Sequence, residues 1–286
     1  MTVDHQHLHD ASTLDLRILP IGKLLPHELH DEQRAAPLIR RLQQDAVLKN
    51  PPVVAPVGVR DDRFVILDGA NRVVALDVLG IGHTLVQVVR YEEPFVELKT
   101  WYHAVSGLST AELTTRLQAQ DGIEHTPVDL FHARALLAAR TILAYYVIPS
   151  GEVIALAGGG LDLHQRTRLL QSIVESYINT ARLNRTNTDK VEELLTLYPN
   201  IAGALIFPKY EPVEILDLAL SGLRVPPGIT RHVVHGRALH LNYPLDKLAA
   251  QVPLEVKNRE LATWLQQKFE KREVRYYAES TFLFDE

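Results

Sequence analysis

The apolar positions in the first fifty residues recur with helical spacing. They lie at i, i+3, i+4 and i+7, on one face of a helix: Ala35, Leu38, Ile39 and Leu42. Asp31 is a residue type that caps helix starts, so the helix is predicted to begin near it. It should end before Asn50-Pro51-Pro52, because a proline has no backbone N–H for the next helical hydrogen bond.

The next fifty residues alternate between strand and helix patterns. Apolar and β-branched runs predict strands over 52–59, 63–67 and 83–89. After the second of these, Asp68-Gly69-Ala70-Asn71-Arg72 forms a tight turn into an apolar helix that ends at Gly80, a residue suited to a helix C-terminus. Residues 17 to about 100 are therefore predicted to form a compact α+β unit.

The remainder of the chain is also mixed. Capping residue types predict helix starts near Ser109, Thr126 and Asp189, and apolar periodicity predicts further helices through 169–177 and 213–220. Strand patterns predict hairpins over 145–156 and 231–242 and a buried strand over 201–207. The predicted fold class is α+β, with a flexible arm over 1–16, an N-terminal domain over 17–105 and a second mixed α/β domain over 106–286.

Composition limits the classes of protein that fit. The chain has 286 residues, of which 46% are hydrophobic and 23% charged, as in ordinary globular proteins. Its net charge is −5, and it has no long basic run, which argues against a nucleic-acid partner. No window reaches the roughly 18 apolar residues of a membrane span. The N-terminus is polar and acidic rather than a signal peptide, so we expect a cytoplasmic protein. Three histidines in the arm, His5, His7 and His9, are interpreted as solvated.

The chain contains no cysteine. This excludes disulfides, thiolate zinc sites, iron–sulfur clusters and a cysteine nucleophile. The absence of cysteine is used again below, to exclude a family whose members need a catalytic cysteine.

The turn Asp68-Gly69-Ala70-Asn71-Arg72 is the first candidate site. A helix N-terminus presents backbone N–H groups and the positive end of the helix dipole, so it binds phosphate readily. Gly69 allows close approach of a ligand to the backbone, Arg72 offers a planar fork for phosphate oxygens, and Asp68 is a candidate Mg²⁺ ligand. Without further support, the motif is more typical of a helix cap beside a surface arginine.

Three other positions carry suitable chemistry. Thr230-Arg231-His232 follows Pro226-Pro227-Gly228 and combines a hydroxyl, a guanidinium and an imidazole that suit a phosphate. Strand alternation would place Arg231 and His232 on opposite faces, so at least one of the three residues would have a structural role. Taken alone, Glu28 fits a solvated loop residue and Trp101 fits a core residue.

Several ordered segments resemble one known family. "LLPHE", "LKNPPVV" and "VILDGANRVVALDVLGI" resemble the ParB/sulfiredoxin-like fold, and within it the free-serine kinases: the archaeal ADP-dependent enzymes and the kinase of staphylococcal siderophore clusters. "VELKTWYHAV", "VPPGITRHVVHGRALHLNYPLDKL" and "RYYAESTFLFDE" extend the resemblance, in patches, from about residue 16 to the end. Sulfiredoxins need a cysteine where Ala70 stands, so their chemistry is excluded. ParB proteins carry a helix-turn-helix domain, which the sequence does not show.

The resemblance implies transfer of a phosphoryl group from ATP or ADP to the hydroxyl of L-serine, with Mg²⁺, giving O-phospho-L-serine for cysteine or siderophore biosynthesis. It casts Glu28 as the group that activates the hydroxyl, assisted by Asp68, which is also the possible Mg²⁺ ligand. Trp101 and His27 would contact the amino acid. The phosphate-binding residues would be Gly69, Ala70, Asn71, Arg72, Thr230, Arg231 and His232. The second domain would complete the active-site cleft.

The sequence departs from the family at Asn71, where those kinases have histidine. Asparagine can donate a hydrogen bond to a phosphate but cannot carry a proton at neutral pH. Two alternatives therefore stay open: a nucleotide-responsive DNA-binding regulator on the same fold, and a homologue that binds ligand without catalysis. The oligomeric state, the donor nucleotide and the choice of serine over other hydroxy amino acids also stay open.

Overall fold

The computed structural model describes residues 14–29 and 32–275. The predicted arm over 1–16 lies almost wholly outside these residues. Its histidines, the Asp31 cap and all but the first residue of the C-terminal motif at 275–286 lie outside as well. Within the described ranges, none of the helices is long and apolar enough to cross a membrane.

The chain folds into two compact units, each made from separate stretches of sequence. Unit 1 comprises the described parts of Met1–Pro26, His30–Glu97 and Val233–Glu286, and unit 2 comprises His27–Leu29 and Leu98–His232. The chain passes between them in β7 (Val96–Thr100) and β14 (Thr230–Val234), which pair as a two-stranded sheet. This division differs from the predicted single boundary near residue 105, because the C-terminal segment returns to unit 1.

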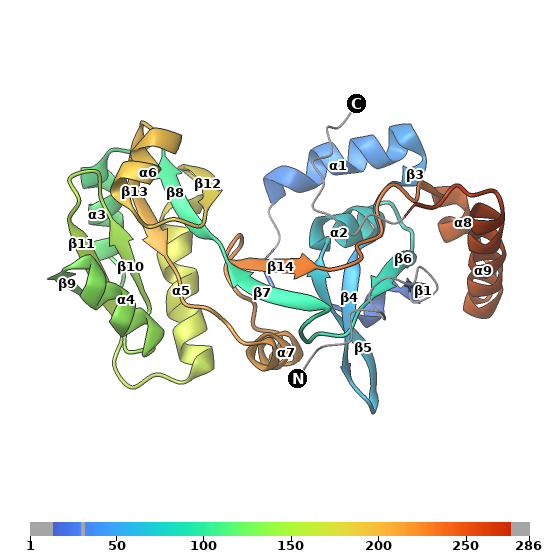
Figure 1. The fold of residues 1–286 in the computed structure, drawn as a ribbon, viewed down its shortest axis with the longest axis horizontal. Coiled ribbons are helices and arrows are strands. Elements are labelled where there is room, and N and C mark those ends of the chain that lie inside the picture. Colours follow the sequence, from blue (N-terminus) through green and yellow to red (C-terminus); the bar gives the residue numbers. More distant parts are fainter. Residues whose placement is uncertain (1–13, 30–31, 276–286) are drawn as a thin grey trace. The chain divides into compact units, whose positions relative to one another are not determined.

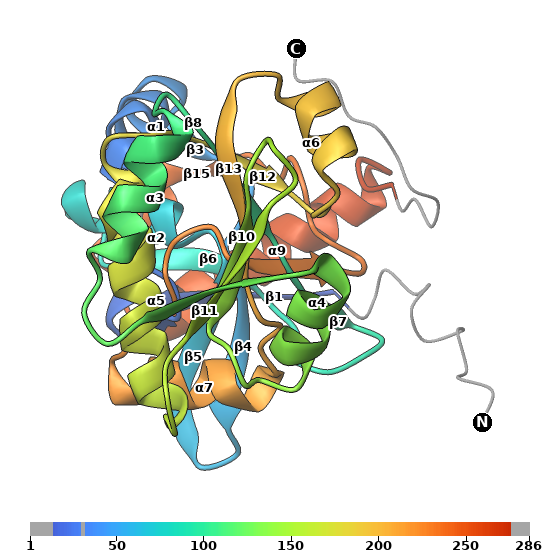
Figure 2. The ribbon, with the colours of Figure 1, turned by 90° about the vertical axis from the view of Figure 1, so that its left-hand side faces the viewer.

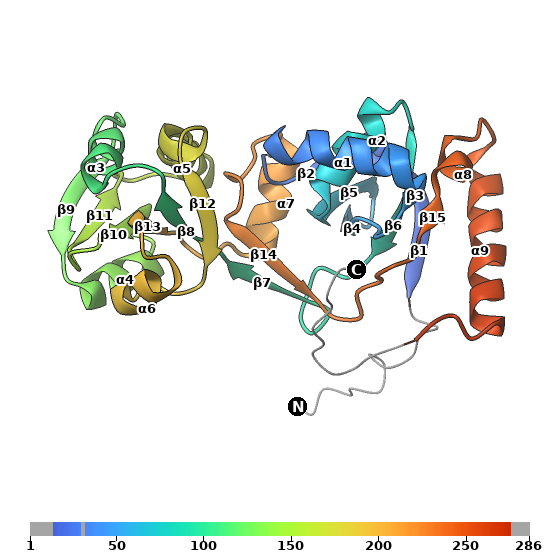
Figure 3. The ribbon, with the colours of Figure 1, turned by 90° about the horizontal axis from the view of Figure 1, so that it is seen from above.

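Unit 1 is built on a mixed five-stranded sheet in the order β1-β6-β4-β5-β2 (Figures 1 and 3). Its strands are β1 (Asp15–Pro20), β2 (Leu24–Pro26), β4 (Val53–Gly58), β5 (Asp61–Asp68) and β6 (His83–Val88). A short 3-10 helix (Ile21–Lys23) joins β1 to β2, and α1 (Glu32–Asp45) packs against α2 (Ala70–Val78). Because α2 begins directly after β5, the predicted strand, turn and helix are confirmed at this site.

The C-terminal segment completes the core of unit 1. There β15 (Tyr243–Pro244) pairs with β3 (Val47–Leu48), and α8 (Leu245–Ala249) and α9 (Leu254–Glu270) follow. Tyr243 and Leu261 share a buried cluster with Leu76 of α2. The Asn258 side chain accepts from the N–H of Ile18 at 2.9 Å and donates to its carbonyl at 3.0 Å, which ties α9 to β1. The first hundred residues therefore depend on the last fifty for their core.

Unit 2 is a six-stranded antiparallel sheet in the order β12-β8-β13-β10-β11-β9. Its strands are β8 (Tyr102–Ser106), β9 (Glu124–Val128), β10 (Ala144–Val147), β11 (Val153–Ala157), β12 (Arg182–Thr186) and β13 (Ile201–Ile206). The helices are α3 (Thr110–Gln118), α4 (Leu130–Ala138), α5 (Leu163–Ile178), α6 (Val191–Leu197) and α7 (Pro212–Ser221). Helices α3 and α5 cover one face of the sheet and α4 and α6 the other (Figures 2 and 3).

The predicted α+β class is confirmed, and two local predictions are wrong. Residues 124–128 form β9 rather than a helix start, and Asp129 caps α4 by accepting a hydrogen bond from the N–H of His132. Pro127 is tolerated in this strand because β9 lies at the sheet edge. The predicted hairpin over 231–242 is also wrong, since its first half pairs with β7 and its second half is not a strand.

Candidate active-site clusters

Glu28 lies in a segment that is fixed to unit 2 by backbone hydrogen bonds. The N–H of Leu29 donates to the carbonyl of Val225 at 3.0 Å, and the N–H of Val225 donates to the carbonyl of His27 at 2.8 Å. Val225 is fully buried. The short parallel contact therefore anchors the backbone on both sides of Glu28.

The carboxylate of Glu28 accepts two hydrogen bonds from the turn before β14. The N–H of Gly228 donates to Oε1 at 2.6 Å, and the Thr230 hydroxyl donates to Oε2 at 2.5 Å. His27 Nε2 lies 2.9 Å from the Thr230 hydroxyl oxygen. Because that hydroxyl gives its proton to Glu28, the imidazole N–H is the donor to it. We call His27, Glu28, Gly228 and Thr230 the carboxylate cluster.

Glycine is required at position 228. Its φ is +81°, in the left-handed region, and a Cβ there would lie 3.1 Å from His103 Nε2 and 3.2 Å from Arg185 Nε. The turn can therefore bring its N–H to Glu28 only because the residue has no side chain.

Arg231 and His232 have different partners, as strand alternation predicts. The Arg231 guanidinium lies over the Trp101 ring, 4.2 Å from its centroid. The His232 ring meets the His27 ring edge-on, with centroids 5.1 Å apart. The N–H of Trp101 donates to the carbonyl of Ile229 at 2.7 Å, so the tryptophan is fixed to the same turn.

A buried histidine, His103, contacts the backbone of this turn. His103 is 1% exposed, its Nδ1 lies 2.8 Å from the Tyr177 hydroxyl, and its ring packs edge-on against Phe207. Burial lowers the pKa of His103 to about 4, against the opposing effect of hydrogen bonds to the backbone of Gly228 and Pro227. The imidazole is therefore neutral at pH 7 and holds the turn that contacts Glu28.

The predicted phosphate turn lies in unit 1, between β5 and α2. Gly69 is the N-cap with φ +94°, and a Cβ there would lie 2.5 Å from Arg72 Nη2 and 3.0 Å from Pro52 Cα. Arg72 Nη2 donates to Asp68 Oδ2 at 2.6 Å, and Arg237 Nη2 contacts the same oxygen. We call Asp68, Arg72 and Arg237 the arginine cluster.

Gln87 of β6 fixes the segment that carries Arg237. This glutamine is 4% exposed. Its Nε2 donates to the carbonyl of Gly236 at 2.9 Å, and its Oε1 accepts from the N–H of Ala238 at 2.8 Å. Both residues that flank Arg237 are therefore held by the Gln87 side chain.

Asp68 is paired with both guanidiniums of the arginine cluster. Although burial opposes it, the Arg72 and Arg237 guanidiniums hold the pKa of Asp68 below its usual value. Asp68 Oδ2 is thus already neutralised by two cations. In the described ranges, no three His, Asp or Glu residues are grouped to hold a metal. The role of Asp68 as a Mg²⁺ ligand stays a prediction.

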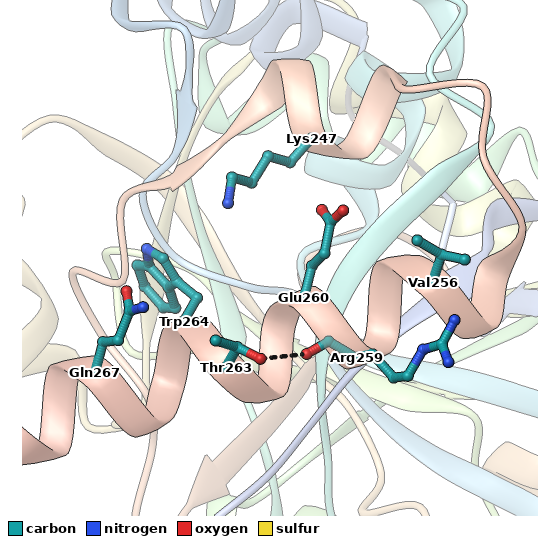
Figure 4. Close-up of a pocket in the computed structure, with 7 residues that line it drawn as sticks. All are labelled: Lys247, Val256, Arg259, Glu260, Thr263, Trp264 and Gln267. Atoms are coloured by element: carbon teal, nitrogen blue, oxygen red, sulfur yellow. Dashed lines mark hydrogen bonds between the residues drawn. The ribbon is translucent and has the colours of Figure 1, made fainter.

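The structure gathers the predicted residues in two groups. His27, Glu28, Thr230, His232 and the Trp101–Arg231 pair lie together in unit 2, and Asp68 to Arg72 lie together in unit 1; their functional roles stay predictions. Gln87, His103 and Arg237 are not among the site residues predicted from the sequence. The only local signal for Arg237 was the His235-Gly236-Arg237 turn, which was assigned to a hairpin. A separate hollow between α8 and α9, beside Lys247, Glu260 and Trp264, is lined by none of the predicted residues (Figure 4).

Solved structures match this fold. A free serine kinase in complex with AMP aligns with a TM-score of 0.68 and 21% identity, over 82% of this chain and 94% of that chain. C-terminally truncated SbnI from Staphylococcus aureus aligns with a TM-score of 0.69 and 20% identity, over 93% of this chain and 100% of that chain. The fold is that of the free serine kinases.

Sequence relatives give the family. No family model matches the chain. An ATP-dependent L-serine kinase from Staphylothermus marinus is 32% identical over 244 residues, which cover 81% of this chain and 90% of the relative. The ATP-dependent L-serine kinase SbnI from Staphylococcus aureus is 23% identical over 98% of this chain and 99% of the relative. The chain belongs to the L-serine kinase family.

Proposed function

We propose that the protein transfers the terminal phosphoryl group of a nucleotide to the hydroxyl of free L-serine, giving O-phospho-L-serine. The observation that carries this proposal is the carboxylate of Glu28, held by the Gly228 N–H and the Thr230 hydroxyl. The names of both sequence relatives favour ATP as the donor. ADP, cytoplasmic location and a place in cysteine or siderophore biosynthesis stay predictions.

Glu28 would orient the serine hydroxyl and take its proton. Each carboxylate oxygen has two lone pairs, so the oxygens that accept from Gly228 and Thr230 can each accept one more hydrogen bond. As the serine oxygen bonds to the terminal phosphorus, the bond from phosphorus to the bridging oxygen breaks, and the nucleotide leaves with one phosphate fewer. Most of the catalysis then comes from positioning and charge neutralisation.

The arginine cluster would supply the positive charge. Phosphoryl transfer needs cations on the phosphate oxygens as well as a group for the nucleophile. Arg72 and the N-terminal turn of α2, with Gly69 to Asn71, would bind the phosphates. Asp68 would hold the guanidiniums in place.

Mg²⁺ would reach the enzyme bound to the nucleotide phosphates. Mg²⁺ sites in phosphotransferases commonly use substrate phosphates and water in addition to one or two carboxylates. Bound there, the ion would neutralise phosphate charge.

The test is to incubate the protein with Mg²⁺ and ATP or ADP, together with L-serine, L-threonine or L-homoserine, and detect the phosphorylated amino acid by mass spectrometry. Phosphoserine from ATP is expected. If folded protein that binds nucleotide makes no product with either donor, it is a ligand-binding homologue instead. Salt-sensitive binding to duplex DNA without kinase activity would favour a regulator.

Glu28→Gln tests the role of the carboxylate. The variant keeps the side-chain shape but loses the basic group, so turnover should fall at least about 100-fold, with little change in the unfolding temperature. Glu152→Gln, at an exposed turn of the same unit, is the matched control and should turn over normally. Normal turnover of Glu28→Gln would remove Glu28 from the mechanism.

A further inference from the structure

We propose that Arg237 binds a phosphate group of the nucleotide, as a second guanidinium beside Arg72. This inference rests on the proposed function, since it names a residue of the same phosphate site. Arg237 is separated from the turn by 169 residues, measured from Asp68, and nothing in the turn motif indicates it.

The charge balance of the arginine cluster favours an anion. Asp68 gives one negative charge to two guanidiniums, which leaves one positive charge in excess. The N-terminus of α2 adds the positive end of a helix dipole, and no acidic residue lies in its first turn. A phosphate is the ligand that would balance this charge.

Buried hydrogen-bond donors without a partner also favour an anionic ligand at the arginine cluster. The Nε atoms of Arg72 and Arg237 are buried donors and, within the described part of the chain, have no hydrogen-bond partner. A buried donor without an acceptor is costly, whereas a guanidinium matches two phosphate oxygens at once. Both arginines use Nη2 for Asp68, so their Nε groups remain for a ligand.

Protein contacts hold Arg237 on both sides and at its guanidinium. Gln87 bonds the carbonyl of Gly236 and the N–H of Ala238, on either side of Arg237, and Asp68 holds its guanidinium. A side chain fixed at both ends loses little conformational freedom on binding phosphate. This arrangement suits a binding residue better than a solvated surface arginine.

The experiment measures nucleotide affinity by calorimetry for the unaltered protein, Arg237→Gln, Arg237→Lys and Arg63→Gln. Arg63 lies on β5 and pairs with Asp61 as Arg237 pairs with Asp68, so it is the matched control. Arg237→Gln should weaken ATP binding by about tenfold or more and raise KM for ATP, while KM for L-serine and adenosine binding stay unchanged. Arg63→Gln should behave as the unaltered protein.

Unchanged ATP affinity in Arg237→Gln, or an equal loss for adenosine, would overturn the inference. Where Arg237→Gln lowers the unfolding temperature, Arg237→Lys decides: weaker ATP binding at a normal unfolding temperature supports the assignment, and normal binding overturns it. Phosphoserine formation is scored separately. If ATP binding depends on Arg237 but no phosphoserine forms, the kinase proposal is wrong and this inference stands. If phosphoserine forms equally well without Arg237, this inference is wrong and the kinase proposal stands.

Discussion

Replacement of Gly228 by alanine tests whether the turn before β14 positions Glu28. The added Cβ would be placed at φ +81°, 3.1 Å from His103 Nε2 and 3.2 Å from Arg185 Nε. His103 is buried and bonded to Tyr177, so it cannot move aside freely. The turn must shift instead, and with it the N–H that donates to Glu28.

The size of the effect follows from two separate costs. The left-handed conformation costs an L-residue about 1–2 kcal/mol of unfolding free energy. Gly222 has a similar φ of +78° and nothing within 4 Å of its Cβ position, so Gly222→Ala carries this cost alone. In Gly228→Ala the steric contact adds a displacement of the 2.6 Å hydrogen bond to Glu28. A misplacement of about 1 Å can cost on the order of 100-fold in rate, so we expect kcat to fall at least about tenfold.

The assay compares kcat for phosphoserine formation and the unfolding free energy in denaturant for both variants. Gly228→Ala should lose at least as much stability as Gly222→Ala, and only Gly228→Ala should lose kcat. Equal activity losses would show that the defect is general strain rather than displacement of Glu28. A normal kcat in Gly228→Ala would refute the positioning role of the turn.

Two further predictions concern buried groups. Burial lowers the pKa of His103 from 6.5 to about 4 in the folded protein, so the unfolded chain takes up the proton first as pH falls. The resulting stability is fully present above pH 6.5 and is lost as pH falls to about 4, by ~3 kcal/mol. His103→Gln should flatten this dependence in unfolding measurements between pH 7 and 4, and an unchanged slope would contradict the assignment. Leu261→Ala, at a position 1% exposed in α9, should cost about 2–5 kcal/mol of unfolding free energy; a loss below about 1 kcal/mol would show that α9 is not part of the unit 1 core.

Local signals in the sequence are sufficient where one short segment determines the structure. The helix after Asp68 is predicted by the apolar pattern of its nine residues and by the glycine that its N-cap geometry requires. The separate partners of Arg231 and His232 follow from strand alternation alone. In these cases the causes lie within a few residues of the effect.

Long-range packing could not be predicted in the same way. Asp68 and Arg237 meet because Gln87 fixes a loop 149 residues further along the chain, and no periodicity records that contact. The local pattern around Pro127 is typical of a helix start. The segment is an edge strand instead because it pairs with a later strand, β11, and no local pattern indicates that pairing. The boundary near residue 105 was misplaced for the same reason, since α9 completes the core of unit 1.

The geometry also decides which predicted residue can take the proton in the proposed reaction. Asn71 has no group that accepts a proton at neutral pH, although histidine stands there in the kinases that the sequence resembles. Asp68 is a weak base, because two guanidiniums stabilise its charged form and hold its pKa low. Glu28 accepts one hydrogen bond at each oxygen and contacts no arginine or lysine in the hydrogen bonds and ion pairs of the described residues. Loss of the histidine is therefore compatible with catalysis, provided that proton transfer is assigned to Glu28 and phosphate binding to the arginine cluster.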